Sequence, residues 1–102
     1  MSAKIPIDRA QIAAFCQRWN VTELSLFGPV LQEDFRPGDE VDMLVAFAPD
    51  ARRDLFDLMR MENELTEILD GSVDLVERAA VERSEDALRR RQILEAEPVY
   101  LA

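Results

Sequence analysis

Apolar residues recur at helical spacing near the start of the chain and then alternate with polar ones. Ile12, Phe15 and Trp19 lie three or four positions apart, which predicts an amphipathic helix over residues 9–19. Leucines alternate with polar residues over positions 22–27, a pattern typical of a strand. The chain therefore begins with a helix followed by a strand.

The middle of the chain predicts a strand, a helix and a second strand. Residues 41–47 are almost continuously apolar, which indicates a strand covered on both faces. An amphipathic helix is predicted over residues 54–70, with Gly71 as its left-handed cap. A short strand follows at residues 72–77. Strands and helices thus succeed one another.

The end of the chain predicts one more helix. Ser84 is its expected N-cap, and the helix must end before Pro98 because the residue preceding a proline disfavours helical geometry. Residues 99–101 are a candidate terminal strand, and residues 36–39 have the composition of a turn. We expect an α/β (α+β) fold, a small mixed β-sheet flanked by helices, in a single domain of residues 1–102.

Several apolar side chains have two interpretations. Phe35 is assigned to burial against the first helix, with contact to a nucleotide base or a partner as the alternative. Trp19 and Tyr100 are assigned to packing. One stripe on the long helix is assigned to the core, with docking of a partner as the alternative. It consists of Leu55, Leu58, Met59 and Leu65.

Composition limits the chemistry. The chain has no apolar run of about 18 residues, as a membrane span requires, and no secretory signal pattern, so we expect a cytoplasmic protein that does not enter membranes. Its one cysteine, Cys16, is expected in the core. The absence of histidine excludes Ser-His-Asp triads, so any general base must be a carboxylate.

The charge is strongly negative. The 21 acidic and 12 basic residues give a net charge of -9, which disfavours direct nucleic-acid binding because phosphate neutralisation supplies much of that affinity. A basic protein partner or metal ions suit this charge better. Arg89, Arg90 and Arg91 are assigned to a solvated helix face that complements the helix dipole, with an acidic partner or nucleotide as the alternative.

Three carboxylates form the candidate site. Glu40 and Asp42 are two positions apart, so they project from the same side of a strand. Asp74 interrupts an apolar strand, and the three converge if this strand pairs beside residues 41–47. Such an oxygen-only set suits Mg²⁺ or Mn²⁺, and the Gly28 turn offers backbone N–H groups to phosphate. Solvated or ion-paired acidic residues are the alternative.

These residues resemble the motif of the minimal nucleotidyltransferase family, small relatives of the DNA polymerase β palm. The family motif is Gly-Ser, ten residues, then Asp-x-Asp. Here Gly28 and Pro29 are followed, after ten residues, by Glu40 and Asp42. The sequence VDLVE at residues 73–77 matches the place of the third family carboxylate. The resemblance covers nearly the whole chain.

The resemblance implies a nucleotidyltransferase fold and metal-dependent adenylyl transfer from ATP. Many members are encoded beside a HEPN-type ribonuclease toxin and act as its antitoxin by adenylylating a toxin tyrosine. Mg²⁺ or Mn²⁺ and ATP are the implied cofactor and substrate, and homo- or hetero-oligomers stay open. The implied residues are Glu40, Asp42 and Asp74 for catalysis and metal binding, and Gly28, Pro29 and Gln32 for nucleotide binding.

Three residues of this chain differ from the family pattern at positions implied to bind the nucleotide or the metal. Pro29 replaces a serine and removes a hydroxyl and an N–H. Gln32 replaces an arginine that many relatives carry, so a cation that could pair with phosphate is lost. Glu40 replaces an aspartate, although Mg²⁺ demands near-ideal geometry. We expect an antitoxin with weakened or lost transferase activity. The alternative is an inactive antitoxin that acts by direct complex formation.

Overall fold

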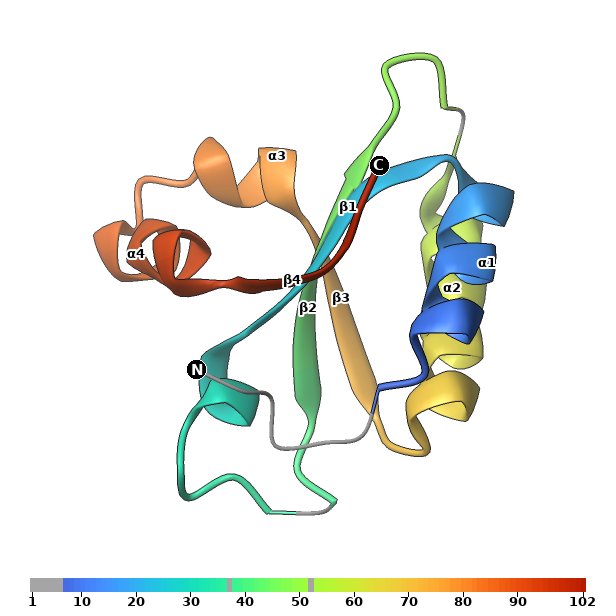
Figure 1. The fold of residues 1–102 in the computed structure, drawn as a ribbon. Coiled ribbons are helices and arrows are strands. Elements are labelled where there is room, and N and C mark those ends of the chain that lie inside the picture. The colour runs from blue at the N-terminus through green and yellow to red at the C-terminus, as the bar shows by residue number, and fades with distance from the viewer. Residues whose placement is uncertain (1–6, 37, 52) are drawn as a thin grey trace.

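A four-stranded sheet forms the centre of the molecule (Figure 1). The computed structural model describes residues 7–36, 38–51 and 53–102, without the side chain of Arg89. The elements in chain order are α1 (Arg9–Trp19), β1 (Val21–Phe27), the 3-10 helix η1 (Gly28–Leu31), β2 (Val41–Phe47), α2 (Leu55–Leu69), β3 (Val73–Glu77), α3 (Arg78–Glu82), α4 (Ala87–Glu95) and β4 (Glu97–Leu101).

The sheet is mixed, with strand order β3-β2-β1-β4. β2 and β3 are parallel, while β1 is antiparallel to both of its neighbours, β2 and β4. The parallel pair is joined by α2, because parallel neighbours need a crossover rather than a tight turn. The predicted fold class, a mixed sheet flanked by helices, is confirmed.

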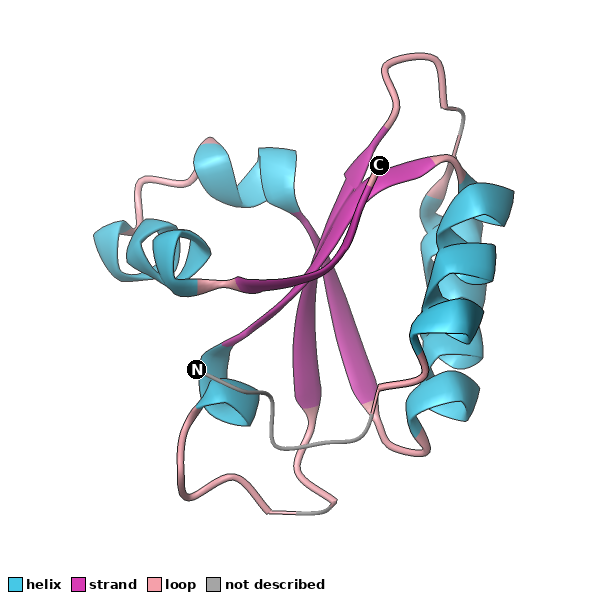
Figure 2. Cartoon of the chain, viewed as in Figure 1, coloured by secondary structure: helices cyan, strands magenta, loops and turns pink. Residues whose placement is uncertain are grey.

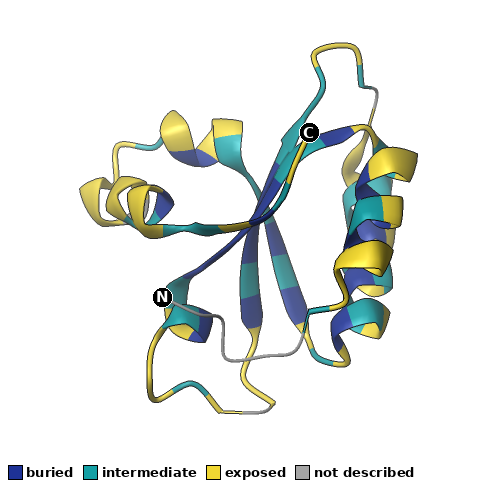
Figure 3. Ribbon diagram, viewed as in Figure 1, coloured by how far each residue is buried: buried dark blue, intermediate teal, exposed yellow. Residues whose placement is uncertain are grey.

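The two faces of the sheet are covered differently. Helices α1 and α2 pack side by side against one face, and α3 and α4 lie on the other (Figures 1 and 2). The larger core lies beneath α1 and α2, where buried residues of the strands meet Ile12, Phe15 and Leu65. A smaller core on the second face joins Phe27 and Leu44 to α3 and α4. Figure 3 shows this burial along the strands and the inner sides of the helices.

The first helix and the first three strands agree with their predictions to within one residue. Asp8 caps α1, because its carboxylate accepts hydrogen bonds from the N–H groups of Ala10 and Gln11. Cys16 is buried as predicted, and burial raises the pKa of its thiol to about 12. Its reactive thiolate is therefore disfavoured.

The predicted last helix is present as α4, but it begins at Ala87, three residues after the expected N-cap Ser84, and the short helix α3 before it was not predicted. The Ser84 hydroxyl accepts a hydrogen bond from the N–H of Asp86, and Asp86 in turn accepts one from the N–H of Leu88. Asp86 therefore performs the capping role that was assigned to Ser84. β4 also begins at Glu97, two residues earlier than predicted, since an edge strand tolerates Pro98.

The assignment of the left-handed cap of α2 to Gly71 is wrong. Asp70 adopts the left-handed conformation, with φ of 54°, and the φ angle of Gly71 is not positive. The short polar side chain of aspartate tolerates this conformation better than most residues do. At the other end of α2, Asp54 and Asp57 form a capping box.

The apolar stripe of α2 is only partly core. Leu65 is buried and Leu58 packs against the core, as predicted, but Leu55 and Met59 are 70% and 53% exposed. Successive helical residues turn by about 100°, so Met59 lies well away from the buried row that contains Leu65. Leu55, in the first turn, is at the margin of that row. Their assignment to the core is therefore wrong.

The other packing predictions agree with the structure. Phe35, Trp19 and Tyr100 are partly buried against the larger core. The predicted turn at residues 36–39 is supported by the hydrogen bond from the Asp39 N–H to the Arg36 carbonyl, while Pro37 lies outside the described residues. No described helix has the length and apolar character that crossing a membrane requires.

The corrected helix cap predicts that Gly71→Ala stabilises the protein by about 0.4–1 kcal/mol. Gly71 has no positive φ, and the nearest atom to an added Cβ is the Leu69 carbonyl oxygen, at 4.0 Å. Alanine therefore restricts the unfolded chain without straining the folded one. Urea unfolding measures the difference. A destabilisation of this size would mean that Gly71 is the left-handed residue after all.

Candidate functional site

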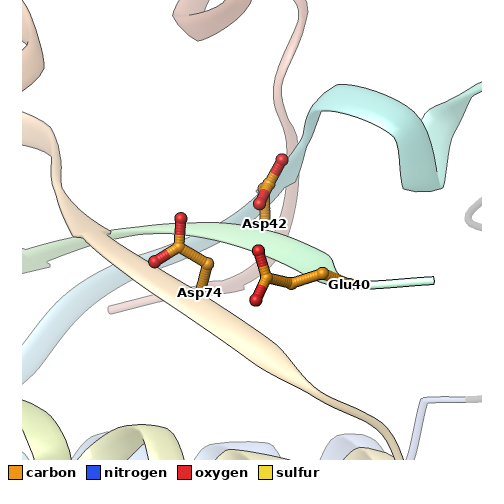
Figure 4. Close-up of side chains that lie close together, drawn as sticks. All are labelled: Glu40, Asp42 and Asp74. Atoms are coloured by element: carbon orange, nitrogen blue, oxygen red, sulfur yellow. The ribbon is translucent and has the colours of Figure 1, made fainter. Parts of the chain in front are cut away.

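Three carboxylates meet at the N-terminal ends of the parallel strands (Figure 4). Asp42 on β2 is paired in register with Asp74 on β3, and Glu40 directly precedes β2. One oxygen from each side chain lies within 4.8 Å of the others. The structure therefore brings together all three residues that the sequence predicted as metal ligands, and their roles stay predictions.

This acidic cluster has the character of a cation site. Asp42 and Asp74 are half-buried and Glu40 is exposed. Neighbouring carboxylates disfavour each other's charged form unless a positive charge is close. Three carboxylate oxygens without nitrogen or sulfur ligands fit a hard cation such as Mg²⁺ or Mn²⁺. The longer side chain of Glu40 does not keep it out of the cluster.

The turn after β1 lies directly against this cluster. Gly28 has a φ of 74°, and a Cβ built on it would lie 2.9 Å from Oδ2 of Asp42. Both observations require glycine at this position. The chain then forms η1, with Pro29 in its first turn, and the Gln32 N–H closes it by donating to the Pro29 carbonyl. Of the residues predicted to bind nucleotide, Gly28 is thus next to the carboxylates, and Pro29 and Gln32 follow it in the same turn.

A cavity of about 590 Å³ opens beside the turn. Two of the predicted nucleotide-binding residues, Gly28 and Gln32, line it, and Pro29 is not among its lining residues. Its other walls come from η1, α4 and the start of β4, and consist of Leu31, Gln92, Glu95, Ala96, Glu97 and Pro98. The sequence analysis did not identify this part of the site.

A second unpredicted residue supports the strand that carries Asp74. Glu62 on α2 accepts a hydrogen bond, of 2.8 Å, from the N–H of Leu75. β3 is an edge strand, so one side of its backbone has no neighbouring strand. The Glu62 carboxylate therefore accepts a hydrogen bond from an N–H group on that open side. In sequence, Glu62 looks like any polar residue of an amphipathic helix, and no local signal distinguishes it.

Comparisons with known proteins agree with this geometry. The family model described as "Nucleotidyltransferase domain" matches residues 9–100. A toxin–antitoxin crystal structure with AMP-PNP is similar with a TM-score of 0.69 and 17% identity, over 94% of this chain and 75% of that chain. The MntA-HepT toxin–antitoxin structure gives a TM-score of 0.60 and 16% identity, over 92% and 70%.

A further solved structure has higher identity. A protein described as a minimal nucleotidyltransferase is similar with a TM-score of 0.67 and 29% identity, over 88% of this chain and 87% of that chain. A comparison with curated proteins finds no match. The likeness to the toxin–antitoxin structures is a likeness of fold.

The close approach of Gly28 to Asp42 predicts that Gly28→Ala damages the acidic cluster as well as stability. The positive φ alone costs an alanine about 1–2 kcal/mol, and the added methyl group displaces the Asp42 carboxylate. Mn²⁺ titration and thermal unfolding measure the two effects. Gly38→Ala is the matched control, because Gly38 also has a positive φ but nothing lies within 4 Å of its Cβ. Equal loss of Mn²⁺ binding in both variants would contradict the contact.

If the acidic cluster holds a cation, Mn²⁺ stabilises the protein. At a hundred times its dissociation constant, the expected gain in unfolding free energy is about 2.7 kcal/mol. Asp74→Asn should abolish this gain. Asp34→Asn, which neutralises an exposed carboxylate of the nearby loop, should retain it. Differential scanning calorimetry with and without Mn²⁺ tests this, and equal gains in the two variants would place the cation elsewhere.

Proposed function

Because the chain belongs to the nucleotidyltransferase domain family, we propose that it is a minimal nucleotidyltransferase-like antitoxin that neutralises a HEPN-type ribonuclease toxin. The observation that carries this proposal is the meeting of Glu40, Asp42 and Asp74 beside the glycine turn. The fold shared with toxin–antitoxin structures supports the choice of partner. The net charge of -9 suits a basic surface on that partner.

The arrangement is suited to adenylyl transfer from ATP to a toxin tyrosine. When bound, Mg²⁺ or Mn²⁺ supplies charge neutralisation at the triphosphate. Glu40 and Asp42 would hold the cation, and Asp74 would accept the proton of the tyrosine hydroxyl. The tyrosine oxygen then bonds to the α-phosphorus and pyrophosphate leaves. Gly28, without a side chain, allows the phosphates to approach the backbone of the turn.

The departures weaken phosphate binding more than cation binding. Glu40 still reaches the other two carboxylates, so the oxygen ligands are retained. Pro29, in the first turn of η1, has no N–H to offer a phosphate. Gln32 is exposed and neutral where a cationic side chain would attract the triphosphate. We therefore propose that adenylyl transfer by this chain is weakened or lost.

A second candidate is an antitoxin that binds its toxin without chemistry. An apolar patch at the start of α2, made of Leu55, Phe56 and Met59, favours it. These side chains are 70%, 69% and 53% exposed, which is unusual for three neighbouring large apolar residues unless a partner covers them. Such neutralisation would require neither ATP nor a cation.

Transfer of label from radioactive ATP to the product of an adjacent toxin gene tests these proposals. We expect the native chain to inhibit the toxin's ribonuclease activity while transferring little label with Mg²⁺ or Mn²⁺. The triple variant Pro29→Ser, Gln32→Arg, Glu40→Asp should transfer more, because it restores a hydroxyl, a cation and the shorter carboxylate. Adding Asp42→Ala to the triple variant should abolish transfer.

Three results would contradict parts of the proposal. Efficient transfer by the native chain, lost in Asp42→Ala, would show that its catalysis is not weakened. Failure of the native chain to bind or inhibit the toxin would contradict the proposed antitoxin function. Inhibition that is lost in Leu55→Ser, Met59→Ser while label transfer persists would favour neutralisation through the α2 patch.

A further inference from the structure

The cavity between η1, α4 and β4 has hydrogen-bond acceptors but no cation in its walls. Gln32 of η1's end and Gln92 and Glu95 of α4 line it, and each side chain carries an oxygen that can accept a hydrogen bond. The lining residues that the structure describes include no arginine or lysine. The side chain of Glu97 lies on the other face of the sheet, because Glu97 pairs with Leu26 of the larger core. Glu95 therefore supplies the carboxylate of this cavity.

The C-terminal end of α4 adds further negative character. Gln92 and Glu95 belong to its last turn, and Ala96 directly follows it. The carbonyl groups of a last turn have no helical N–H partners and form the negative end of the helix dipole, which favours cations. The last turn, residues 92–95, is described in full and contains no basic residue. Among the described ion pairs, none joins Arg91, one turn earlier, to Glu95.

Apolar surface lies next to these acceptors. It comes from Leu31, Ala96 and Pro98. Leu88, one helical turn before Gln92, is 67% exposed and extends this surface along α4. A volume of about 590 Å³ is in the range that holds a drug-sized molecule. The cavity thus has room for a side chain and for adjoining residues of the segment that carries it.

The occupant that fits both the acceptors and the apolar walls is an arginine side chain. Its guanidinium is always charged and has five N–H donors and no acceptor. Its aliphatic stem can lie along apolar surface while the charged group reaches the acceptors. Lysine carries a compact, strongly hydrated ammonium, which matches several acceptors on one wall less well. A phosphate group, in contrast, would face Glu95 and the negative end of α4.

We propose that this cavity is a docking site for an arginine-bearing segment of a partner protein, with the guanidinium beside Glu95 and the C-terminal carbonyl groups of α4. The inference rests on the proposed antitoxin function, which requires a basic partner surface, and specifies the part of this chain that meets it. Gly28 lines the cavity and lies against Asp42, so the bound segment would lie beside the acidic cluster. The docking site is on the opposite face of the sheet from the α2 patch (Figure 1).

NMR titration of the full ¹⁵N-labelled chain with N-acetyl-arginine amide tests the chemistry of the cavity. The signals of Gln92 and Ala96 should shift with a dissociation constant of about one millimolar, as a molecule of this size allows. N-acetyl-citrulline amide, in which a neutral urea replaces the guanidinium, should bind about tenfold more weakly. Glu95→Gln should weaken arginine binding about threefold, as for an exposed ion pair. Glu67→Gln, which neutralises an exposed glutamate of α2, should leave it unchanged.

Calorimetric titration with the toxin tests the partner. Glu95→Arg places a positive charge in the docking site and should weaken the complex at least about tenfold, because like charges then meet. Arginine in the last turn of a helix complements the dipole, so this variant should fold, and thermal unfolding verifies it. Glu67→Arg is the matched control on the other face of the sheet and should bind the toxin as the native chain does.

The outcomes separate this inference from the function on which it rests. Equal binding of the arginine and citrulline probes, or shifts confined to residues outside the cavity, would overturn the inference. Native toxin affinity in Glu95→Arg would also overturn it, and would leave the antitoxin function intact. If the native chain does not bind the toxin, the antitoxin proposal fails, while probe binding that depends on Glu95 would still support the chemistry of the cavity. Shifts of Gln92 and Ala96 with ATP and Mn²⁺, but not with the arginine probe, would indicate a nucleotide site and overturn the inference.

Discussion

The parallel pairing of β2 with β3 is the contact on which the site depends. It places Asp42 opposite Asp74, and the hydrogen bond from the Val41 N–H to the Ser72 carbonyl extends the pairing to the start of both strands. A slip of one residue would turn Asp74 toward the core beneath α1 and α2, because side chains alternate between the faces of a sheet. The buried neighbours of Asp74 resist that slip. Burial of apolar side chains on one face of the sheet thus fixes the register that places Asp42 opposite Asp74 on the other face.

The two faces of the sheet perform different tasks. The face under α1 and α2 holds most of the buried apolar residues, and that burial supplies the main stabilisation. The other face has a small core beneath α3 and α4, and its acidic end lies beside Gly28, the first residue of η1. The three carboxylates therefore lie on the face opposite the larger core. Glu62, reaching from α2 to the edge of β3, links the stable face to the strand that carries Asp74.

Three substitutions relative to the family motif meet different surroundings in the fold. Glu40 is exposed, so its extra methylene has space to fit and its carboxylate still joins the cluster. Pro29 suits the first turn of η1 and costs the fold little, but it removes a donor from the phosphate side. Gln32 lines the cavity and gives its wall no positive charge, which an arginine would supply. The fold thus accommodates all three, and under the proposed function their effects fall on the binding of the nucleotide.

The sequence by itself determined the first three strands, the first helix and the shared side of Glu40 and Asp42, whereas the position of Asp74 beside them depended on the pairing of β2 with β3. The strands, the helix and the shared side follow from local periodicity and from spacing along strands, which depend on neighbouring residues. Only the tertiary structure decided that Asp70 rather than Gly71 is left-handed, that Leu55 and Met59 are exposed, and that Glu95 lines a cavity. Each of these depends on how a whole helix or strand lies against the sheet. That placement results from packing between residues distant in sequence, which a local sequence pattern does not predict.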